Sequence, residues 1–391
     1  MRPCKYLIII LSALQLTGCH NKEVPSEIKN QIDSLSAVMV PQHMESLCDL
    51  SLTMSEGGVI TVRGETNLPE AKDKVIELLN RSGYKYNDSI TVLPDTSVVK
   101  KPWGLVTVSV CNMRTEPSNG AEMATQPLMG TPVKILNRSG GWLFIQTPDA
   151  YLGWTGDDAI AELSDNEMAA WKSSERLIFL KNTGVITDSY DQTVSDIVLG
   201  CVLKKTGEVK DFYSVVLPDG REGRIRKNEA SDFRVWAEKA EPVADLMIAF
   251  ARTMMGSPYL WGGTSTKGMD CSGFTKTIYF TGGVILARDA SGQYRYGTER
   301  SIEHGCDSLA PGDLLFFGRM NDGKKRITHT GMYIGDTEFI HSSGMVRINS
   351  LDSTRVNYSQ YRASTLLGAK RVIGVTPGKG IERVSQHRWY F

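Results

Sequence analysis

Apolar and polar positions change their periodicity along the chain, and these changes divide it into segments. Residues 19–45 are mostly polar, with apolar positions at helical spacing, and predict a tether that contains a helix. Residues 46–96 carry two strand patterns, at 59–62 and 89–93, with a helical pattern between them. This arrangement predicts a small α/β domain, and no pattern of chemically active residues falls within it.

Short strand patterns separated by turn signals occupy residues 97–165, and a weaker copy of the same plan follows at residues 172–236. Short strands at this spacing predict two small β-barrels. Residues 240–375 read as a helix, a glycine-rich loop, a second helix and then strands, and we treat them as the last domain. The tail at 376–391 is basic and aromatic, and the sequence assigns it no role.

The first of the β-rich segments carries aromatic residues at defined places. Asn112-Met113-Arg114, Gly141-Trp142 and Gly153-Trp154 resemble a bacterial SH3-like domain. In the second segment, Arg224 stands at the position that Trp154 occupies in the first. We therefore expect the second barrel to keep the fold without the aromatic surface. The alternative is that the aromatic residues of the first barrel only fill its core.

The N-terminal segment looks like an export signal. Two basic residues precede an apolar stretch at 6–16, which is too short to span a bilayer. The stretch ends in Leu-Thr-Gly-Cys at 16–19, which resembles a bacterial lipobox. The resemblance implies that residues 1–18 are a lipoprotein signal peptide and that Cys19 is lipidated. We then expect an exported, membrane-anchored lipoprotein that faces the periplasm, the alternative being a plain secretory signal.

Composition narrows the function classes. With 391 residues the chain is long enough for several domains. Its 44 basic and 44 acidic residues cancel, which argues against a nucleic-acid partner bound by bulk electrostatics. None of the seven cysteines forms a C-x-x-C pair, which argues against a zinc ribbon or a dithiol redox site. Five cysteines remain after Cys19, so at least one is free in an exported protein.

Cys271 is the candidate nucleophile. Glycines and a proline precede it, and residues 275–280 are apolar at helical spacing, so it is expected at the N-terminus of a helix. Unpaired amides and the helix dipole favour a thiolate there and predict a lowered thiol pKa. The alternative is a buried, inert cysteine.

A thiolate nucleophile needs a base, and two histidines flank one predicted hairpin. A three-residue loop at 335–337 would pair Gly331 with His341, so that His329 and His341 point to the same face. A two-residue turn would place them on opposite faces. The pattern therefore favours a loop of odd length, with both histidines facing the cysteine helix.

Other chemistries fit less well. A Cys-His-His set could bind zinc only with an open coordination position, and no H-E-x-x-H motif is present. Residues 263–267 lack the final glycine of a serine-hydrolase elbow, since Lys267 stands there. We therefore expect no metal and no cofactor.

Four blocks in this last domain resemble the NlpC-type cysteine peptidase family. They are Tyr259-x-Trp-Gly-Gly, Asp270-Cys271-Ser272-Gly273-Phe274, the stretch at 311–317 and the stretch at 329–335. The resemblance implies a papain-like α+β fold in which Cys271 is the nucleophile, His329 the base and His341 the third polar residue. It also implies that Tyr259 assists the oxyanion, although a packing role for this ring is the alternative.

The whole chain is then multidomain: a small α/β N-terminal unit, two bacterial SH3-like β-barrels and a C-terminal papain-like α+β catalytic domain. This arrangement resembles the γ-D-glutamyl-diamino-acid endopeptidases of the dipeptidyl-peptidase VI type. It implies an acyl-enzyme mechanism that cleaves the γ-D-Glu–diamino acid bond of peptidoglycan stem peptides with a free N-terminal L-Ala. The alternatives are an amidase or acyltransferase on the same fold, and a non-catalytic wall-binding lipoprotein.

Selection of a free amine requires a carboxylate. Arg288-Asp289 follows the nucleophile helix and resembles a family segment, so we assign Asp289 to the amine, unless it only caps a helix. Arg288 is assigned to a substrate carboxylate or to a structural ion pair. Ser272 is a further expected substrate contact, and Tyr151 or Trp154 could wall the pocket. The expected partners are peptidoglycan stem peptides and, through the lipid alone, a membrane; we expect a monomer.

Overall fold

The computed structural model describes residues 22–40 and 44–391. The predicted signal peptide and the lipidation of Cys19 lie outside the described residues. Residues 22–40 and 47–92 form one compact unit, and residues 44–46 and 93–391 form another. No helix in these residues is long and apolar enough to cross a membrane.

The first unit is an α/β domain. Its elements are α1 (Ser26–Met39), β1 (Cys48–Met54), β2 (Ile60–Thr66), α2 (Pro69–Arg81) and β3 (Tyr86–Val92). β2 pairs with β1 antiparallel and with β3 parallel, through the crossover helix α2. Ile32 of α1, Val62 of β2 and Leu79 of α2 are buried in one core. The helix predicted within a tether at 19–45 is therefore part of this domain, because its apolar stripe is buried there.

Two seven-stranded antiparallel sheets follow, which we call the first β-domain (103–163) and the second β-domain (176–232). The first contains β4 (Trp103–Val106), β5 (Met113–Arg114), β6 (Met123–Thr125), β7 (Pro132–Ser139), β8 (Trp142–Gln146), β9 (Leu152–Gly156), η1 (Asp157–Ala159) and β10 (Ile160–Leu163). The second contains β11 (Arg176–Phe179), β12 (Thr183–Thr187), β13 (Thr193–Val198), β14 (Val202–Val209), β15 (Phe212–Val216), β16 (Glu222–Arg226), η2 (Lys227–Glu229) and β17 (Ala230–Asp232). The strand orders, β10-β4-β7-β8-β9-β5-β6 and β17-β11-β14-β15-β16-β12-β13, are the same plan twice. The helix α3 (Asp165–Ser173) joins the two sheets, and a capping box between Ser164 and Glu167 fixes its start.

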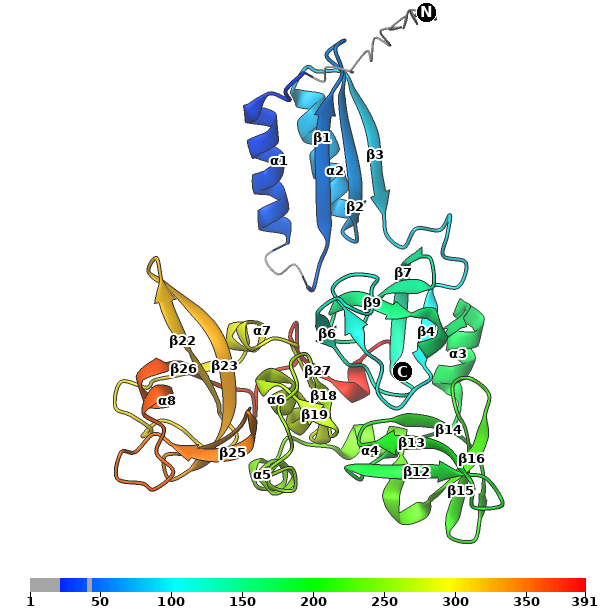
Figure 1. Cartoon of the computed structure of the whole chain (residues 1–391), viewed down its shortest axis with the longest axis vertical. Coiled ribbons are helices and arrows are strands. Elements are labelled where there is room, and N and C mark those ends of the chain that lie inside the picture. The colour runs from blue at the N-terminus through cyan, green and yellow to red at the C-terminus, as the bar shows by residue number, and fades with distance from the viewer. Residues whose placement is uncertain (1–21, 41–43) are drawn as a thin grey trace, which may run out of the picture. The chain divides into compact units, whose positions relative to one another are not determined.

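The last domain is α+β, and its centre is a six-stranded antiparallel sheet in the order β21-β26-β22-β23-β24-β25. Its strands are β18 (Thr264–Ser265), β19 (Gly268–Met269), β20 (Val284–Leu286), β21 (Thr298–Arg300), β22 (Leu314–Asn321), β23 (Lys324–Gly335), β24 (Glu338–Ser343), β25 (Met345–Ser350), β26 (Leu366–Arg371) and β27 (Ile381–Arg383). The helix α4 (Phe233–Lys239) follows the second β-domain and packs against its strands β11 and β17. The helices of the last domain are α5 (Ala244–Arg252), α6 (Cys271–Thr281), α7 (Ala290–Arg295), α8 (Gln360–Thr365) and the short η3 (Val384–Gln386). Phe274 and Ile278 of α6 pack against buried residues of β22, β23 and β24 in one core. Figure 1 shows α6 between this sheet and the first β-domain.

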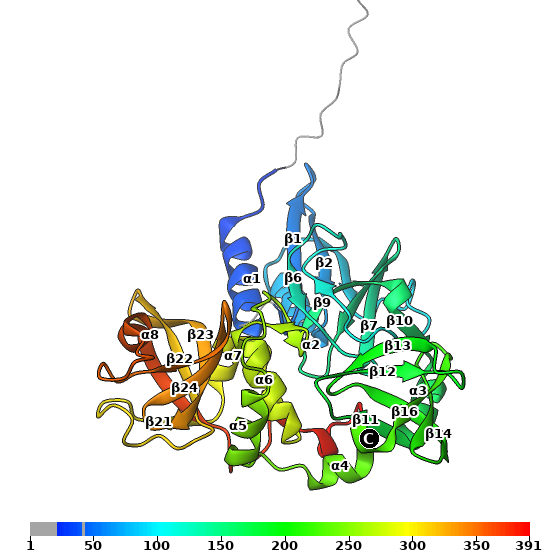
Figure 2. The ribbon, with the colours of Figure 1, turned by 60° about the horizontal axis from the view of Figure 1, so that its bottom comes forward.

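The C-terminal tail joins these parts. Its strand β27 pairs with β20 beside α6. Trp389 packs edge-on against Trp103 of the first β-domain, with ring centroids 5.4 Å apart. Phe391 stacks on Phe233 at the start of α4, with centroids 5.3 Å apart. The aromatic tail therefore packs the last domain against its neighbours. In the ribbon of Figure 2, the C-terminus lies near β11 and α4.

Candidate active site

Cys271 is the first residue of α6, as the sequence predicts. Asp270 caps the helix: its Oδ1 accepts a hydrogen bond of 2.7 Å from the amide of Gly273. A Cβ at Gly273 would lie 2.0 Å from the carbonyl oxygen of Gly263, so only glycine lets the preceding loop close onto the helix. The cap and this close contact together fix the helix start at Cys271.

The predicted lowering of the thiol pKa is wrong. Cys271 is only 7% exposed, and burial raises the pKa of its thiol to about 11. The charge of Asp270 raises it further, while the Thr330 amide lowers it. The helix terminus does not compensate for this desolvation, so the resting group is a thiol. A neighbouring base must therefore take the proton when the sulfur attacks.

The base and its partners form a chain of hydrogen bonds. His329 Nε2 lies 2.7 Å from His341 Nδ1, and His341 Nε2 lies 2.9 Å from Asn349 Oδ1. Asn349 Nδ2 donates to the Asn357 carbonyl at 3.0 Å, which orients the amide so that Oδ1 faces His341. His341 must then carry its proton on Nε2 and accept at Nδ1, so His329 donates through Nε2. The Nδ1 atom of His329 is left unprotonated and can accept the thiol proton.

Both imidazoles are neutral in this arrangement. Burial lowers the pKa of His341 to about 4, with the nearby guanidinium of Arg362 acting in the same direction. Burial also lowers the pKa of His329 well below its usual value, again with a contribution from Arg362. A neutral His329 is the form that accepts a proton, so the site is set for general-base catalysis.

The hairpin between the histidines differs from the predicted one. The loop has two residues, Asp336 and Thr337, both with positive φ (49° and 64°), instead of three. A register shift after Tyr333 inserts the extra residue into β23 as a bulge. Pairing beyond the bulge is again the predicted one, and the two histidines share a face. The third residue that the prediction placed in the loop is therefore the bulge residue of β23, Ile334.

A cavity of about 400 Å³ opens beside Cys271. Its walls come from the start of α6, the segment before α7, the first β-domain and β23. The lining residues include Met44, Glu122, Tyr151, Tyr259, Trp261, Ser272, Asp289 and Thr328. A Cβ at Gly262, whose φ is +75°, would lie 2.4 Å from the Met123 carbonyl, so this glycine lets β6 approach the catalytic domain closely. No single domain encloses the cavity by itself.

Asp289 and Tyr151 meet inside this cavity, although 138 residues separate them. Tyr151 Oη lies 3.1 Å from each carboxylate oxygen of Asp289. Asp289 precedes α7 but makes no side-chain cap bond, contrary to the helix-cap alternative. Burial raises the pKa of Asp289, while the Arg288 charge opposes this rise. A desolvated carboxylate at the wall of a cavity is a suitable partner for a ligand ammonium group.

Arg288 also lines the cavity, but its donors are already used. It is 1% exposed and forms an ion pair with Asp270, its Nη2 lying 2.5 Å from Oδ2. Its Nη1 donates to Ser272 Oγ at 3.1 Å and its Nε to Thr125 Oγ1 at 2.9 Å. Of the two assignments for Arg288, the structure supports the ion pair. Ser272 is held in the same network and positions the start of α6.

Tyr259 and Trp154, the two remaining candidates, differ in whether they line the cavity. Tyr259 lines the cavity beside Cys271, and burial raises the pKa of its phenol, so the hydroxyl remains a donor. Trp154 instead packs on Phe144, with ring centroids 5.1 Å apart, and is not among the residues that line the cavity. Of the two residues expected at the pocket wall, Tyr151 lines the cavity, whereas the side chain of Trp154 lies over its own sheet.

Comparison with known proteins agrees with this geometry. Residues 256–367 match the NlpC/P60 family, and residues 113–160 match the bacterial dipeptidyl-peptidase Sh3 domain. The γ-D-glutamyl-L-lysine dipeptidyl-peptidase of Bacillus cereus is 34% identical over 236 residues, which cover 58% of this chain and 68% of that protein. The chain belongs to the NlpC/P60 family. It is therefore a cysteine peptidase, with an SH3-like domain before the catalytic one.

Two further NlpC/P60 relatives extend the likeness beyond the catalytic domain. Dipeptidyl-peptidase 6 of Lysinibacillus sphaericus is 28% identical over 281 residues, which cover 67% of this chain and 96% of that protein. The crystal structure of an NlpC/P60 family protein from Bacillus cereus superposes with a TM-score of 0.60 at 25% identity, covering 69% of this chain and 99% of that one. The likeness thus includes the SH3-like part as well as the peptidase domain.

Several residues of this NlpC/P60 site were not predicted from the sequence. Asn349 orients His341, but an asparagine in a strand carries no signal of its own. Met44 reaches the cavity from the short segment between α1 and β1, and its carbonyl accepts from the Leu152 amide at 2.7 Å. Glu122 Oε1 accepts from Trp261 Nε1 at 2.7 Å at the same opening. Met44 and Glu122 reach the site through contacts between distant segments, whereas Asn349 lies eight residues after His341 on the neighbouring strand β25.

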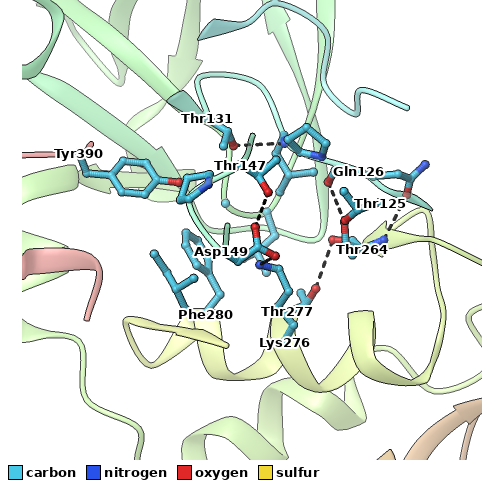
Figure 3. A pocket seen from close by; sticks show the side chains of 16 residues that line it. Thr125, Gln126, Thr131, Thr147, Asp149, Thr264, Lys276, Thr277, Phe280 and Tyr390 are labelled. Carbon is cyan, nitrogen blue, oxygen red and sulfur yellow. Dashed lines mark hydrogen bonds and ion pairs between the residues drawn. The ribbon is translucent and has the colours of Figure 1, made fainter. Parts of the chain in front are cut away.

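A second, smaller cavity of about 80 Å³ lies between α6 and the first β-domain (Figure 3). Lys276 of α6 reaches Asp149 of the first β-domain, with Nζ 2.9 Å from Oδ2, and Thr147 Oγ1 donates to Oδ1 of the same carboxylate at 2.6 Å. Burial would raise the pKa of Asp149, but Lys276 and Thr147 lower it below its usual value. This ion pair fastens the nucleophile helix to the first β-domain.

The zinc alternative gains no support. Within residues 22–40 and 44–391 there is no cluster of three His, Cys, Asp or Glu side chains arranged to hold a metal ion. His329 and His341 instead belong to the hydrogen-bonded chain described above.

Proposed function

We propose that this peptidase hydrolyses the γ-D-Glu–diamino acid bond of peptidoglycan stem peptides that begin with a free L-Ala. The observation that carries the proposal is the Asp289–Tyr151 pair in the cavity beside Cys271. A free ammonium group is the substrate feature that a buried carboxylate recognises, and an acylated amine would leave that carboxylate unpaired. The relatives' names, γ-D-glutamyl-L-lysine dipeptidyl-peptidase and dipeptidyl-peptidase 6, support the same assignment.

The geometry supports an acyl-transfer mechanism. The Cys271 sulfur attacks the γ-carbonyl carbon of D-Glu while His329 Nδ1 accepts the thiol proton. His341 accepts the Nε2 hydrogen bond of His329 and keeps the ring oriented as it becomes charged. The amide of Cys271, which has no partner within the helix because it lies in the first turn, and the Tyr259 hydroxyl are the donors that we assign to the developing oxyanion.

Collapse of the tetrahedral intermediate breaks the C–N bond. The His329 imidazolium gives its proton to the departing amine of the diamino acid, and L-Ala-γ-D-Glu stays attached to Cys271 as a thioester. His329, neutral again, activates a water molecule that hydrolyses the thioester. Asp289 holds the ammonium group of L-Ala through both steps and so places the γ-carbonyl at the sulfur.

The test uses L-Ala-γ-D-Glu-L-Lys and its meso-diaminopimelate analogue, each with a free and with an acetylated N-terminus. Mass spectrometry of the products should show L-Ala-γ-D-Glu released from the free-amine peptides, with kcat/KM about a hundredfold lower after acetylation. Cys271→Ala should abolish release, whereas Cys306→Ala, at a half-buried thiol outside the cavity, should not. Equal cleavage of free and acetylated peptides would contradict amine recognition, and no cleavage of either would contradict the proposed substrate.

We also propose that acyl chains on Cys19 hold the exported chain at a membrane. Metabolic labelling with a palmitate analogue should mark the full chain, and Cys19→Ala should remove both the label and the membrane association. Cys48→Ala is the matched control and should keep both. A labelled Cys19→Ala variant would contradict the proposal.

A further inference from the structure

Arg362 contacts the ring of Phe317, which in turn contacts His329, the proposed base. It belongs to α8, and its guanidinium lies over the ring of Phe317, 5.6 Å from the centroid. Phe317 is paired with His329 across β22 and β23, and their ring centroids are 5.7 Å apart. Nη2 of Arg362 donates to Ser343 Oγ at 3.2 Å, two residues after His341. The guanidinium is therefore held beside the His329–His341 pair by contacts from two strands.

Among the described residues, no carboxylate pairs with the guanidinium of Arg362. Its contacts within the described residues are one hydroxyl and the rings of Phe317 and Tyr361, and none of them is a carboxylate. Two other buried or partly buried arginines of this domain form ion pairs, Arg288 with Asp270 and Arg371 with Asp313 at 2.7 Å. Arg362 is nevertheless half-buried, and burial of an unpaired cation is costly. Most of its five donors remain available to a ligand anion.

Arg362 and Asp289 flank Cys271 on different sides. Asp289 faces the first β-domain, where Tyr151 reaches it. Figures 1 and 2 both show α8 on the flank of the catalytic sheet away from that domain, with α6 between them. Arg362 is also not among the residues lining the cavity that holds Asp289. Across the scissile bond the site is therefore acidic on one side and basic on the other.

We propose that Arg362 binds a carboxylate of the leaving diamino acid and so determines specificity on the leaving-group side of the bond. This inference rests on the proposed function, which places the ammonium end of the substrate at Asp289. The remainder of the substrate then extends past Cys271 toward Arg362. A planar guanidinium supported by an aromatic ring is suited to bidentate binding of a carboxylate.

The test compares L-Ala-γ-D-Glu-L-Lys with its C-terminal amide, on the full chain and on Arg362→Gln. The wild type should cleave the free acid with kcat/KM about ten- to a hundredfold above that of the amide, as expected for a charge-assisted hydrogen-bonded pair. Arg362→Gln should lose most of this preference by slowing the acid and sparing the amide. Arg362→Lys should retain part of it, and Arg355→Gln, at an exposed arginine before α8, should retain all of it.

A third peptide, with D-isoglutamine in place of D-Glu, distinguishes the two carboxylates of the substrate. If amidation of the glutamyl carboxylate abolishes the effect of Arg362→Gln, then Arg362 reads that group and the proposal is wrong. Equal cleavage of acid and amide by the wild type would overturn it without any variant. Failure of the wild type to cleave any of the peptides would count against the proposed function instead.

Discussion

The two β-domains share one strand order, yet among the described residues only the first lines the cavity beside Cys271. The residue before β9 in the first is Tyr151, which reaches Asp289; the residue before β16 in the second is Arg221, which pairs with Asp219 on its own loop at 2.7 Å. The first is fastened to α6 by Asp149 and Lys276. The shared fold supplies a position for a loop in each β-domain. Docking against the catalytic domain brings the loop of the first β-domain to the cavity.

The largest effect is expected from separating the first β-domain from α6. Lys276→Met leaves the buried Asp149 carboxylate without its cation and should lower the free energy of unfolding by about 3 to 5 kcal/mol. Because the folded pKa of Asp149 is lowered, the stabilisation is present at neutral pH and is lost as the pH falls through that pKa. Urea denaturation followed by tryptophan fluorescence measures the change.

The matched control in the second β-domain is Arg221→Met, which breaks the half-exposed pair with Asp219. Its stability should stay within measurement error of the wild type. Comparable losses for the two variants would mean that Lys276 and Asp149 do not fasten the domains together.

The next largest effect concerns amine recognition. Asp289→Asn keeps the shape of the side chain but removes its charge, and kcat/KM for the free-amine peptide should fall about a hundredfold. Asp219→Asn in the second β-domain should leave kcat/KM unchanged. A loss of activity in both would show that the second β-domain also contributes to the site.

The same carboxylate predicts a pH dependence. Burial raises the pKa of Asp289, so it loses its charge at a higher pH than an exposed aspartate as the solution is acidified. Below the raised pKa, the ratio of wild-type to Asp289→Asn kcat/KM should fall by up to about tenfold per pH unit. The ratio cancels the titration of His329, and a ratio that stays constant from pH 4 to pH 7 would contradict the role of Asp289.

The smallest effect is expected from the tyrosine hydroxyl. Tyr151→Phe removes one hydrogen bond to Asp289 and should lower kcat/KM about five- to tenfold. Trp154→Phe, in the same sheet but outside the cavity, should change it less than twofold. A larger effect from Trp154→Phe than from Tyr151→Phe would contradict the assignment of Tyr151, and not Trp154, to the cavity wall.

Local sequence patterns correctly predicted the features that neighbouring residues determine. Glycines before Cys271 and the helical period after it predict the start of α6 correctly. Alternation around His329 and His341 predicts their shared face, although the turn has two residues and the bulge supplies the third. The thiol pKa was predicted in the wrong direction because its largest cause, burial, depends on the sheet and loops packed over Cys271.

The sequence by itself determined the repeated β-rich plan, the helix that begins at Cys271 and the paired histidines, since periodicity and turn residues act between near neighbours. The tertiary structure alone decided which side chains meet. It joins Tyr151 to Asp289, gives His341 its partner Asn349 and packs the aromatic tail between the domains. Among the described residues it gives Arg362 no carboxylate partner. His341 and Asn349 are only eight residues apart on neighbouring strands. The contacts of Tyr151 and of the aromatic tail depend on desolvation and close packing between segments far apart in the chain, which no local pattern records.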